Sequence, residues 1–154
     1  MKFQNCLFLI LLIVCLSCQS KKTDKQTGID STLFYTNPVI GGGSEPWAIF
    51  HEGKYYYTQS LADCIILWET DDITQLAKAA KKNVYSPQNA SGISHLWGPE
   101  IHYMDNKWYI YCAADDGNID NRQIYVLENE SPDPMKGEFV MKGRISTDKN
   151  NNLA

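Results

Sequence analysis

The sequence of 154 residues contains no cluster of basic residues and no ligand spacing typical of a metal site. Its fourteen Lys and Arg are outnumbered by eighteen Asp and Glu, which gives a net charge of −4 with histidine neutral. Nucleic-acid-binding domains usually carry a basic patch or stripe, so we expect no nucleic-acid partner. No CxxC pair is present either, and we therefore expect no metal and no cofactor.

Long hydrophobic runs are also scarce, and the main one lies at the N-terminus. Lys2 is followed by a run of eleven apolar residues, Cys6–Leu16. A run of this length is too short to cross a bilayer, which takes about twenty apolar residues, but it is typical of a signal-peptide core. We therefore interpret residues 1–18 as an export signal and not as part of the fold.

The end of this signal resembles a bacterial lipobox, because the small residue Ser17 precedes Cys18. Cys15 departs from the pattern, since an aliphatic residue is usual at its position. We expect Cys18 to become an acylated N-terminus that anchors an exported lipoprotein to the bacterial cell envelope, at the outer membrane or cell surface or else in the periplasm. The alternative is an ordinary signal peptide that is cleaved without lipid attachment.

Residues 19–30 are polar, rich in lysine and free of aromatics, which is typical of a flexible linker. The folded domain is expected over residues 31–154, where aromatic residues become frequent. It contains only two cysteines, Cys64 and Cys112, both in apolar, strand-like surroundings. Two separate buried thiols are the favoured interpretation, and a disulfide is the alternative.

The domain contains an internal repeat with an offset of 53 residues. The segment Glu45–Tyr57 (EPWAIFHEGKYYY) corresponds to Trp97–Tyr111 (WGPEIHYMDNKWYIY), and the offset aligns their prolines. Each copy has an acidic residue beside a proline, a strand-like segment, a two-residue turn and a second aromatic strand. The turns, Glu52-Gly53 and Asp105-Asn106, suit a type I′ hairpin, in which both positions have φ > 0.

Aromatic and β-branched segments predict eight strands in two groups of four. These are Trp47–His51, Lys54–Ser60, Cys64–Glu69 and Asn83–Tyr85, then Glu100–Met104, Lys107–Ala114, Gln123–Glu128 and Glu138–Ile145. The segment Asp71–Lys82 predicts a short helix, with Asp at its start and Lys at its end. A four-stranded antiparallel unit repeated at about 50 residues is typical of β-propeller blades. The predicted fold class is therefore all-β, with two propeller blades, and we expect the sequence to be part of a larger ring.

Residues 33–148 resemble the N-terminal part of glycoside hydrolase family 43, whose five-bladed propellers act on polysaccharides that contain arabinose or xylose. The resemblance rests on the order and spacing of seven motifs: Asn37-Pro38, Glu45-Pro46-Trp47, Gly53–Tyr57, Trp97–His102, Lys107–Tyr111, Ala113–Gly117 and Arg122–Leu127. The last two are similar to family members that are arabinofuranosidases. The resemblance thus implies a glycoside hydrolase, and an α-L-arabinofuranosidase in particular.

The resemblance also implies an inverting mechanism, with a carboxylate base and a carboxylic acid roughly 6.5–9.5 Å apart. In the family the base is an aspartate before the proline of the first blade, and Glu45 occupies that position. The extra methylene of Glu45 moves its carboxylate by about 1.5 Å. The family's two other catalytic carboxyl groups would follow Ala154, so we expect these 154 residues alone to be inactive. A propeller that binds glycans without cleaving them is the alternative, and a scaffold without a carbohydrate ligand is a third.

Four further residues are candidate substrate-binding groups. Trp47 and Trp97 either stack on a sugar ring or pack between blades. Glu100 either accepts a hydrogen bond from a sugar hydroxyl or holds strand ends together. His102, two residues further on, lies on the same strand face, and a core histidine is its favoured interpretation. The group Asp115–Gly117 lacks the acidic spacing of a calcium loop, and we interpret it as a hairpin turn.

Overall fold

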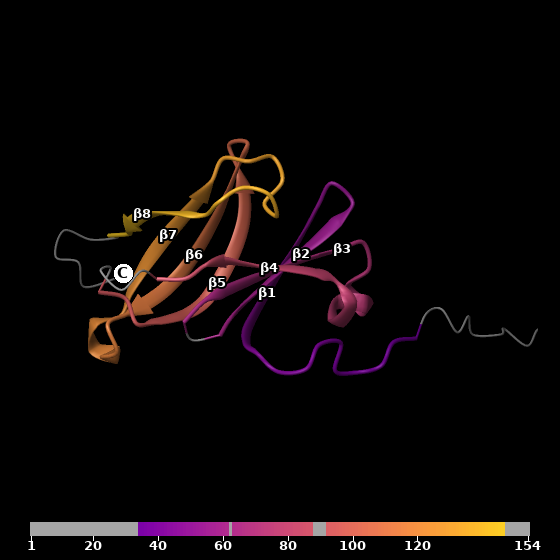
Figure 1. Cartoon of the computed structure of the whole chain (residues 1–154), viewed down its shortest axis with the longest axis horizontal. Helices are drawn as coiled ribbons and strands as arrows, with labels where there is room; N and C mark the ends of the chain where they lie inside the picture. The colour runs from indigo at the N-terminus through magenta and orange to yellow at the C-terminus, as the bar shows by residue number, and fades with distance from the viewer. Residues whose placement is uncertain (1–33, 62, 88–91, 147–154) are drawn as a thin grey trace, which may run out of the picture. The chain divides into compact units, whose positions relative to one another are not determined.

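A computed structural model describes residues 34–61, 63–87 and 92–146, which lie almost entirely in one compact unit, Tyr35–Ala154. Eight strands form two antiparallel sheets of four, each ordered as in the sequence (Figure 1). The first sheet consists of β1 (Ser44–His51), β2 (Lys54–Ser60), β3 (Ile65–Thr70) and β4 (Ala80–Tyr85), and the second of β5 (His95–Met104), β6 (Lys107–Asp115), β7 (Gln123–Asn129) and β8 (Val140–Arg144). The all-β prediction with two four-stranded sheets is confirmed. The predicted signal, Cys18 and linker lie outside the described residues.

Each sheet begins with one of the predicted hairpins. The turn between β1 and β2 has φ angles of 48° at Glu52 and 83° at Gly53. The turn between β5 and β6 has φ angles of 50° at Asp105 and 61° at Asn106. Both positions of each turn are therefore left-handed, as a type I′ hairpin requires.

The sequence repeat is also a structural repeat, down to an irregularity in the strand pairing. The β1–β2 ladder is interrupted just before Trp47, and the β5–β6 ladder just before Glu100, 53 residues later. Inside each bulge the residue before the proline has a positive φ, 55° at Glu45 and 52° at Gly98. Glu45 is therefore equivalent to Gly98, and Glu100 to Trp47. The acidic residues beside the two prolines, which the sequence pattern had treated alike, occupy different positions.

The predicted short helix over Asp71–Lys82 is present but shorter than predicted. The structure has a 3₁₀-helix, η2 (Ile73–Lys78), which Asp72 caps by accepting a hydrogen bond from the backbone N–H two residues on. The chain is extended again by Ala79, and β4 begins at Ala80. The lysines at the end of the predicted helix therefore pair with β3, because a tertiary ladder overrides their weak helical preference.

The second sheet also departs from the predicted strand bounds. β5 begins at His95 and not at Glu100, because pairing with β6 continues on both sides of the bulge. β8 is shorter than the predicted strand Glu138–Ile145. β1 and β4 each begin three residues before their predicted starts at Trp47 and Asn83, and the remaining strands match their predicted ranges to within one residue.

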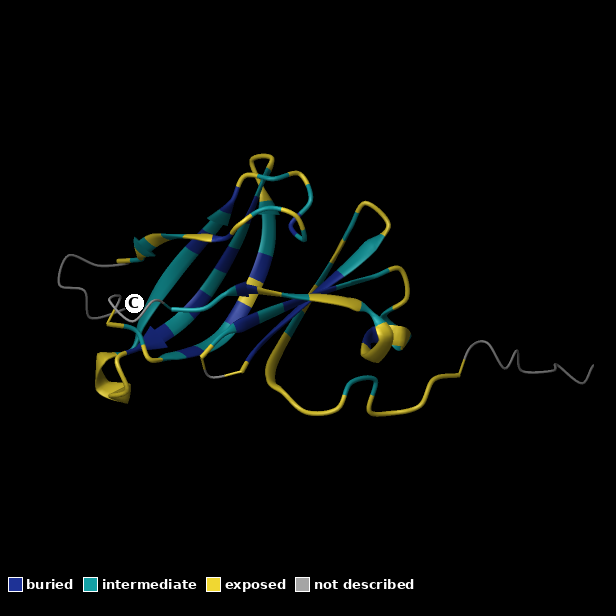
Figure 2. Cartoon of the chain, in the orientation of Figure 1, coloured by how far each residue is buried: buried dark blue, intermediate teal, exposed yellow. Residues whose placement is uncertain are grey.

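The hydrophobic core lies between the two sheets (Figure 2). β6 shows how the sequence produces it, since its residues alternate between buried and half-buried along most of its length. The apolar residues of the described chain with no exposed surface are Ile65, Leu67, Leu96, Ile101, Trp108, Ile110, Ala114 and Leu127. Burying a large apolar side chain contributes about 1.5–3 kcal/mol to the free energy of unfolding. These buried side chains therefore contribute most of the free energy that holds the two sheets together.

Two side-chain hydrogen bonds cross between the sheets near the bulges. Thr58 Oγ1 donates to the carbonyl of Pro99 at 2.7 Å, and Trp47 Nε1 donates to the carbonyl of Ile101 at 3.1 Å. Both acceptors lie on β5, so the two bonds fix β1 and β2 against the strand that carries the second bulge.

The two cysteines of the domain are unbridged, in agreement with the favoured interpretation, but the predicted burial holds for one of them only. Cys112 is 2% exposed and belongs to the core, whereas Cys64 is partly exposed. Burial raises the pKa of the Cys112 thiol to about 12. This thiol therefore stays protonated at neutral pH and acts as a small apolar side chain.

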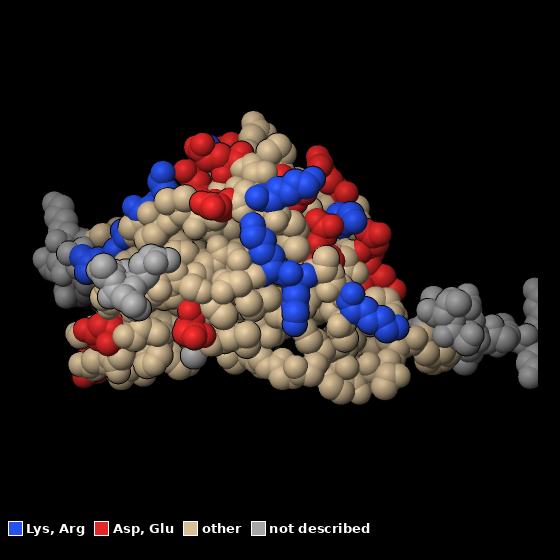
Figure 3. All heavy atoms as spheres, viewed as in Figure 1, with Lys and Arg blue, Asp and Glu red and all other residues tan. Residues whose placement is uncertain are grey.

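Charged side chains other than Asp115 lie mostly on the surface, many of them in ion pairs. Lys54 lies 3.4 Å from Glu69, and Glu128 lies 3.3 Å from Lys107 and 3.1 Å from Lys142. Figure 3 shows acidic and basic side chains interspersed on the face that it presents. Among the described residues, no helix is long and apolar enough to cross a membrane.

Candidate active site

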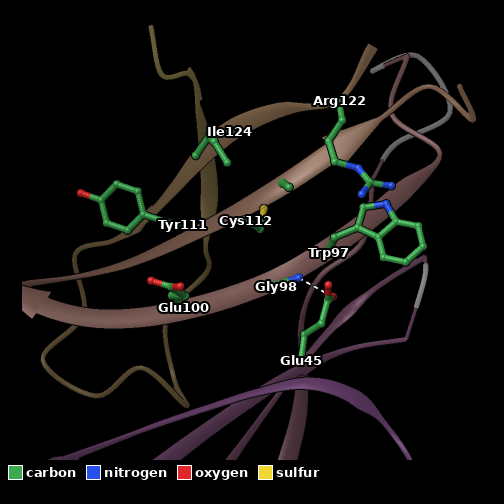
Figure 4. A pocket seen from close by; sticks show the side chains of 9 residues that line it. Glu45, Trp97, Gly98, Glu100, Tyr111, Cys112, Arg122 and Ile124 are labelled. Atoms are coloured by element: carbon green, nitrogen blue, oxygen red, sulfur yellow. Dashed lines mark hydrogen bonds between the residues drawn. The ribbon is translucent and has the colours of Figure 1, made fainter. Parts of the chain in front are cut away.

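A pocket of about 270 Å³ lies over the second sheet beside the bulge of β1 (Figure 4). Its wall consists of Glu45, Trp97, Gly98, Glu100, Tyr111, Cys112, Ala113, Arg122 and Ile124. In Figure 4, Trp97 and Arg122 stand on one side of Glu45, and Glu100 and Tyr111 lie on the other. The fold therefore brings together three of the candidate residues from the sequence: Glu45, Trp97 and Glu100.

Glu45 reaches from the first sheet to the second. Its Oε2 accepts a hydrogen bond from the Gly98 backbone N–H at 2.6 Å and one from Ser60 Oγ at 3.3 Å. Its φ of 55° is uncommon for a residue other than glycine, and it precedes Pro46, which favours extended conformations. Such backbone strain costs on the order of 1–3 kcal/mol. The two hydrogen bonds fix the direction of the carboxylate at this strained position.

Asp115 is the buried centre of the hydrogen-bond network behind the pocket. Its side chain is 2% exposed. Oδ2 accepts from Trp97 Nε1 at 3.1 Å and from Arg122 at 3.1 Å (Nε) and 3.0 Å (Nη2). Oδ1 accepts from Gly117 N at 3.1 Å and lies 3.1 Å from His95 Nδ1. Burial acts to raise the pKa of Asp115, but these hydrogen bonds outweigh it and lower the pKa below the ordinary value.

Arg122 completes this network on the pocket side. It follows a short 3₁₀-helix, η3 (Ile119–Asn121), which returns the chain from the end of β6 to the start of β7. The guanidinium carbon lies 4.4 Å from the centroid of the Trp97 ring, which is a cation–π contact. The wall beside Glu45 is therefore a stacked indole and guanidinium, both tied to one buried carboxylate.

The sequence matches the model of a known family, glycosyl hydrolases family 43, over residues 35–153. The match covers more than half of the chain. This chain belongs to family 43.

Characterised relatives of this family 43 chain are arabinofuranosidases. It is 34% identical over 122 residues to an extracellular exo-α-(1→5)-L-arabinofuranosidase of Streptomyces avermitilis, which covers 75% of this chain and 25% of that protein. It is 33% identical over 118 residues to the enzyme of the same name from Streptomyces chartreusis, covering 73% of this chain and 36% of that protein.

Solved structures support the propeller fold of this family 43 chain. The α-L-arabinofuranosidase of Lactobacillus brevis superposes with a TM-score of 0.67 at 31% identity, covering 73% of this chain and 39% of that one. The α-L-arabinanase of Cellvibrio cellulosa superposes with a TM-score of 0.53 at 15% identity, covering 67% and 35%, and supports the fold alone. The two sheets thus correspond to blades of the family's five-bladed propeller, and the chain spans well under half the length of these relatives.

Two candidate residues lie next to the pocket and not in its wall. Trp47 packs between the sheets through its bond to Ile101, and it also lines a smaller hollow of about 210 Å³ beside Glu45. The His102 ring lies between Trp47, at 5.4 Å, and Tyr111, at 5.6 Å. Its side chain is 31% exposed, so His102 is at the border of the core and not inside it. Substrate contacts by Trp47 and His102 remain predictions.

Glu100 lies on the open side of the same strand. Its Oε2 is 3.5 Å from His102 Nε2, as expected for two residues on one strand face. Glu100 is exposed and lines the pocket. Sugar binding by Glu100 remains a prediction.

Sequence reasoning missed Asp115 and Arg122. The predicted hairpin turn Asp115–Gly117 covers only the start of a longer connection between β6 and β7 that includes η3. The Gly117 N–H bonds to the Asp115 side chain, which is buried. Asp115 interrupts the alternation of β6, because it is buried directly after the buried Ala114. The pattern of apolar residues therefore gave no signal for a buried carboxylate, which requires a cationic partner such as Arg122. Within the described ranges, no group of three His, Cys, Asp or Glu is placed to hold a metal ion.

Proposed function

We propose that this chain is part of an exported glycoside hydrolase that cleaves arabinose-containing polysaccharides or oligosaccharides with inversion, as an α-L-arabinofuranosidase does. The observation that carries the proposal is the Glu45 carboxylate, held by Gly98 and Ser60 at the mouth of a pocket whose wall is Trp97 stacked on Arg122. The function is proposed for the protein produced from its whole reading frame. Family membership and the arabinofuranosidase relatives support this substrate class.

In the proposed reaction Glu45 is the general base. An inverting hydrolase needs an ionised carboxylate that removes a proton from water on one side of the sugar, while an acid protonates the leaving oxygen on the other. A base must be held in one direction relative to the anomeric carbon. The hydrogen bonds of Glu45 supply such an orientation, and its second oxygen is available to a water molecule in the pocket.

The test is the Glu45→Gln substitution, assayed on aryl α-L-arabinofuranoside and aryl xyloside. Loss of the base should lower kcat by about 10²–10⁴-fold and leave KM nearly unchanged, because the neutral amide keeps the shape of the side chain. Glu52→Gln is the matched control, since Glu52 is an exposed turn residue with the same charge. Full activity of Glu45→Gln would place the base elsewhere.

A second candidate function is glycan binding without cleavage. It is favoured by the 2.6 Å bond from Gly98 N to Glu45, which occupies one carboxylate oxygen, and by the longer side chain relative to the family's aspartate. The discriminating variant is Glu45→Asp. If Glu45→Asp cleaves the substrate while the wild type only binds it, the natural protein is a glycan-binding propeller.

We also propose that export ends in acylation of Cys18. Metabolic labelling with a fatty-acid analogue should mark the wild type and Cys64→Ala, but not Cys18→Ala. The Cys64 variant is the matched control, because it removes a thiol from the folded domain. Equal labelling of all three proteins would mean that the signal is cleaved without a lipid.

A further inference from the structure

Asp115 is a buried carboxylate that the proposed reaction does not use. Its side chain is 2% exposed, yet its oxygens contact donors from Trp97, Arg122, His95 and the backbone of Gly117. Burying a charge is costly unless it is paired and hydrogen-bonded. The carboxylate therefore strongly favours the one arrangement in which all of these donors point at it.

Two of the donors belong to the pocket wall beside Glu45. Asp115 Oδ2 lies 3.1 Å from Trp97 Nε1 and 3.0 Å from Arg122 Nη2, so one oxygen fixes the edge of the indole and the plane of the guanidinium together. In the resulting stack the guanidinium carbon of Arg122 lies 4.4 Å from the centroid of the Trp97 ring. The Arg122 side chain is 30% exposed. It forms a flat polar-aromatic surface in the pocket.

The same network reaches Glu45 through the backbone. Trp97 is followed directly by Gly98, whose N–H donates to the Glu45 carboxylate at 2.6 Å. That N–H belongs to the peptide group that joins Trp97 to Gly98. A shift of the Trp97 main chain therefore changes the donor that orients Glu45, although Asp115 itself is not part of the pocket lining.

We propose that Asp115 is a positioning residue that fixes Trp97 and Arg122 as one stacked wall, and that this wall receives a sugar ring beside Glu45. The inference rests on the proposed function, because the ring is that of the proposed substrate. Asp115 does not touch the sugar. It acts through Trp97 and Arg122.

The first test measures binding of α-1,5-linked arabinotriose by calorimetry, with protein from the whole reading frame. Asp115→Asn keeps the shape of the side chain but turns one acceptor into a donor, and the dissociation constant should rise about tenfold. Glu128→Gln is the matched control. Glu128 also contacts lysines and accepts from Tyr109 OH at 3.1 Å, but it does not line the pocket, so binding should be unchanged.

The second test reads the position of Trp97 directly and does not need a sugar. The indole N–H resonance of Trp97, assigned with Trp97→Phe, should shift in Asp115→Asn and stay in place in Glu128→Gln. If Asp115→Asn does not fold, Arg122→Lys replaces it in both tests, because lysine keeps the charge but loses the flat stack and the paired contact.

The outcomes separate this inference from the proposed function. If the wild type binds the trisaccharide, a tenfold weaker Asp115→Asn with a shifted Trp97 resonance supports the wall. An unchanged dissociation constant or an unmoved resonance overturns it. If the wild type binds no arabinotriose, the proposed function fails and the sugar-binding half of the inference fails with it. The Trp97 resonance then still decides whether Asp115 positions the wall.

Discussion

The two sheets have the same backbone bulge but carry different side chains on the two sides of its proline. In β1 a carboxylate, Glu45, precedes the proline and Trp47 follows it; in β5 Gly98 precedes the proline and Glu100 follows it. The residue before the proline has nearly the same φ in both copies, 55° and 52°. Glycine adopts this conformation without strain and glutamate does not. The strain is therefore present only in the copy whose side chain crosses to the neighbouring sheet.

The tryptophans near the two bulges are also held differently. Trp47 donates to a backbone carbonyl, that of Ile101, whereas Trp97 donates to the carboxylate of Asp115. A carbonyl does not titrate and a carboxylate does. The hydrogen bond of Trp47 therefore does not depend on the charge of its partner, whereas the hydrogen bond of Trp97 depends on the charge of Asp115.

The largest expected difference between the copies concerns equivalent positions in β2 and β6. Trp108 is fully buried between the sheets and contacts Tyr56 edge to face, with ring centroids 4.8 Å apart, while its equivalent Tyr55 packs on the exposed Phe50. Trp108→Ala should cost about 3–5 kcal/mol of unfolding free energy. Tyr55→Ala should cost about 1 kcal/mol or less, because little cavity is created.

Urea denaturation of the two variants measures this difference. Similar losses of unfolding free energy for Trp108→Ala and Tyr55→Ala would mean that the face of the first sheet that carries Tyr55 is covered as fully as the face of the second sheet that carries Trp108. The comparison between the copies would then fail.

A smaller effect is expected at the bulges themselves. No atom lies within 4 Å of a Cβ built on Gly98, so Gly98→Ala should cost about 1 kcal/mol through its positive φ alone. Gly41→Ala is the control, since its Cβ also meets nothing and its φ is not positive. At Glu45 the same argument predicts that Glu45→Gly is more stable than Glu45→Ala by about 1 kcal/mol.

The midpoints of thermal unfolding of these four variants measure the differences in stability. Equal stability of Glu45→Gly and Glu45→Ala would show that the positive φ in β1 carries no strain, and the contrast between the bulges would be lost.

The smallest effect is a local response to acid. Because the pKa of Asp115 is lowered, its stabilisation is fully present above its unfolded pKa of about 3.9 and is lost as pH falls through the folded pKa. The indole N–H resonance of Trp97 should therefore move only below about pH 4. The Trp47 resonance should not follow it, since its acceptor is a carbonyl.

A pH series of indole spectra tests this difference, and Asp115→Asn at pH 7 should reproduce the acid position of Trp97. Parallel movement of both resonances would indicate global unfolding and not a local change at Asp115.

The sequence predicts the local parts of this fold well. The turn residues Glu52-Gly53 and Asp105-Asn106 favour a type I′ turn through their own conformational preference, without help from distant contacts. Where the preference is weak, as in Lys81 and Lys82 of β4, the ladder with β3 decides the structure and the prediction fails.

The candidate site was predicted less completely, and for a physical reason. Glu45 and Trp97 belong to motifs that are contiguous in sequence, so they are recognisable before folding. The contact of Asp115 with Trp97 depends on the register of β5 against β6, and its contact with Arg122 depends on the loop around η3. No local preference encodes either of them.

The hydrogen bond from Gly98 to Glu45 has a consequence for the order in which the site forms during folding. Its partners are 53 residues apart and lie on different sheets. A hairpin closes within about 1–10 microseconds, but a single two-stranded hairpin is only marginally stable in water. The direction of the Glu45 carboxylate is therefore set by the docking of the second sheet and not by the hairpin that carries Glu45.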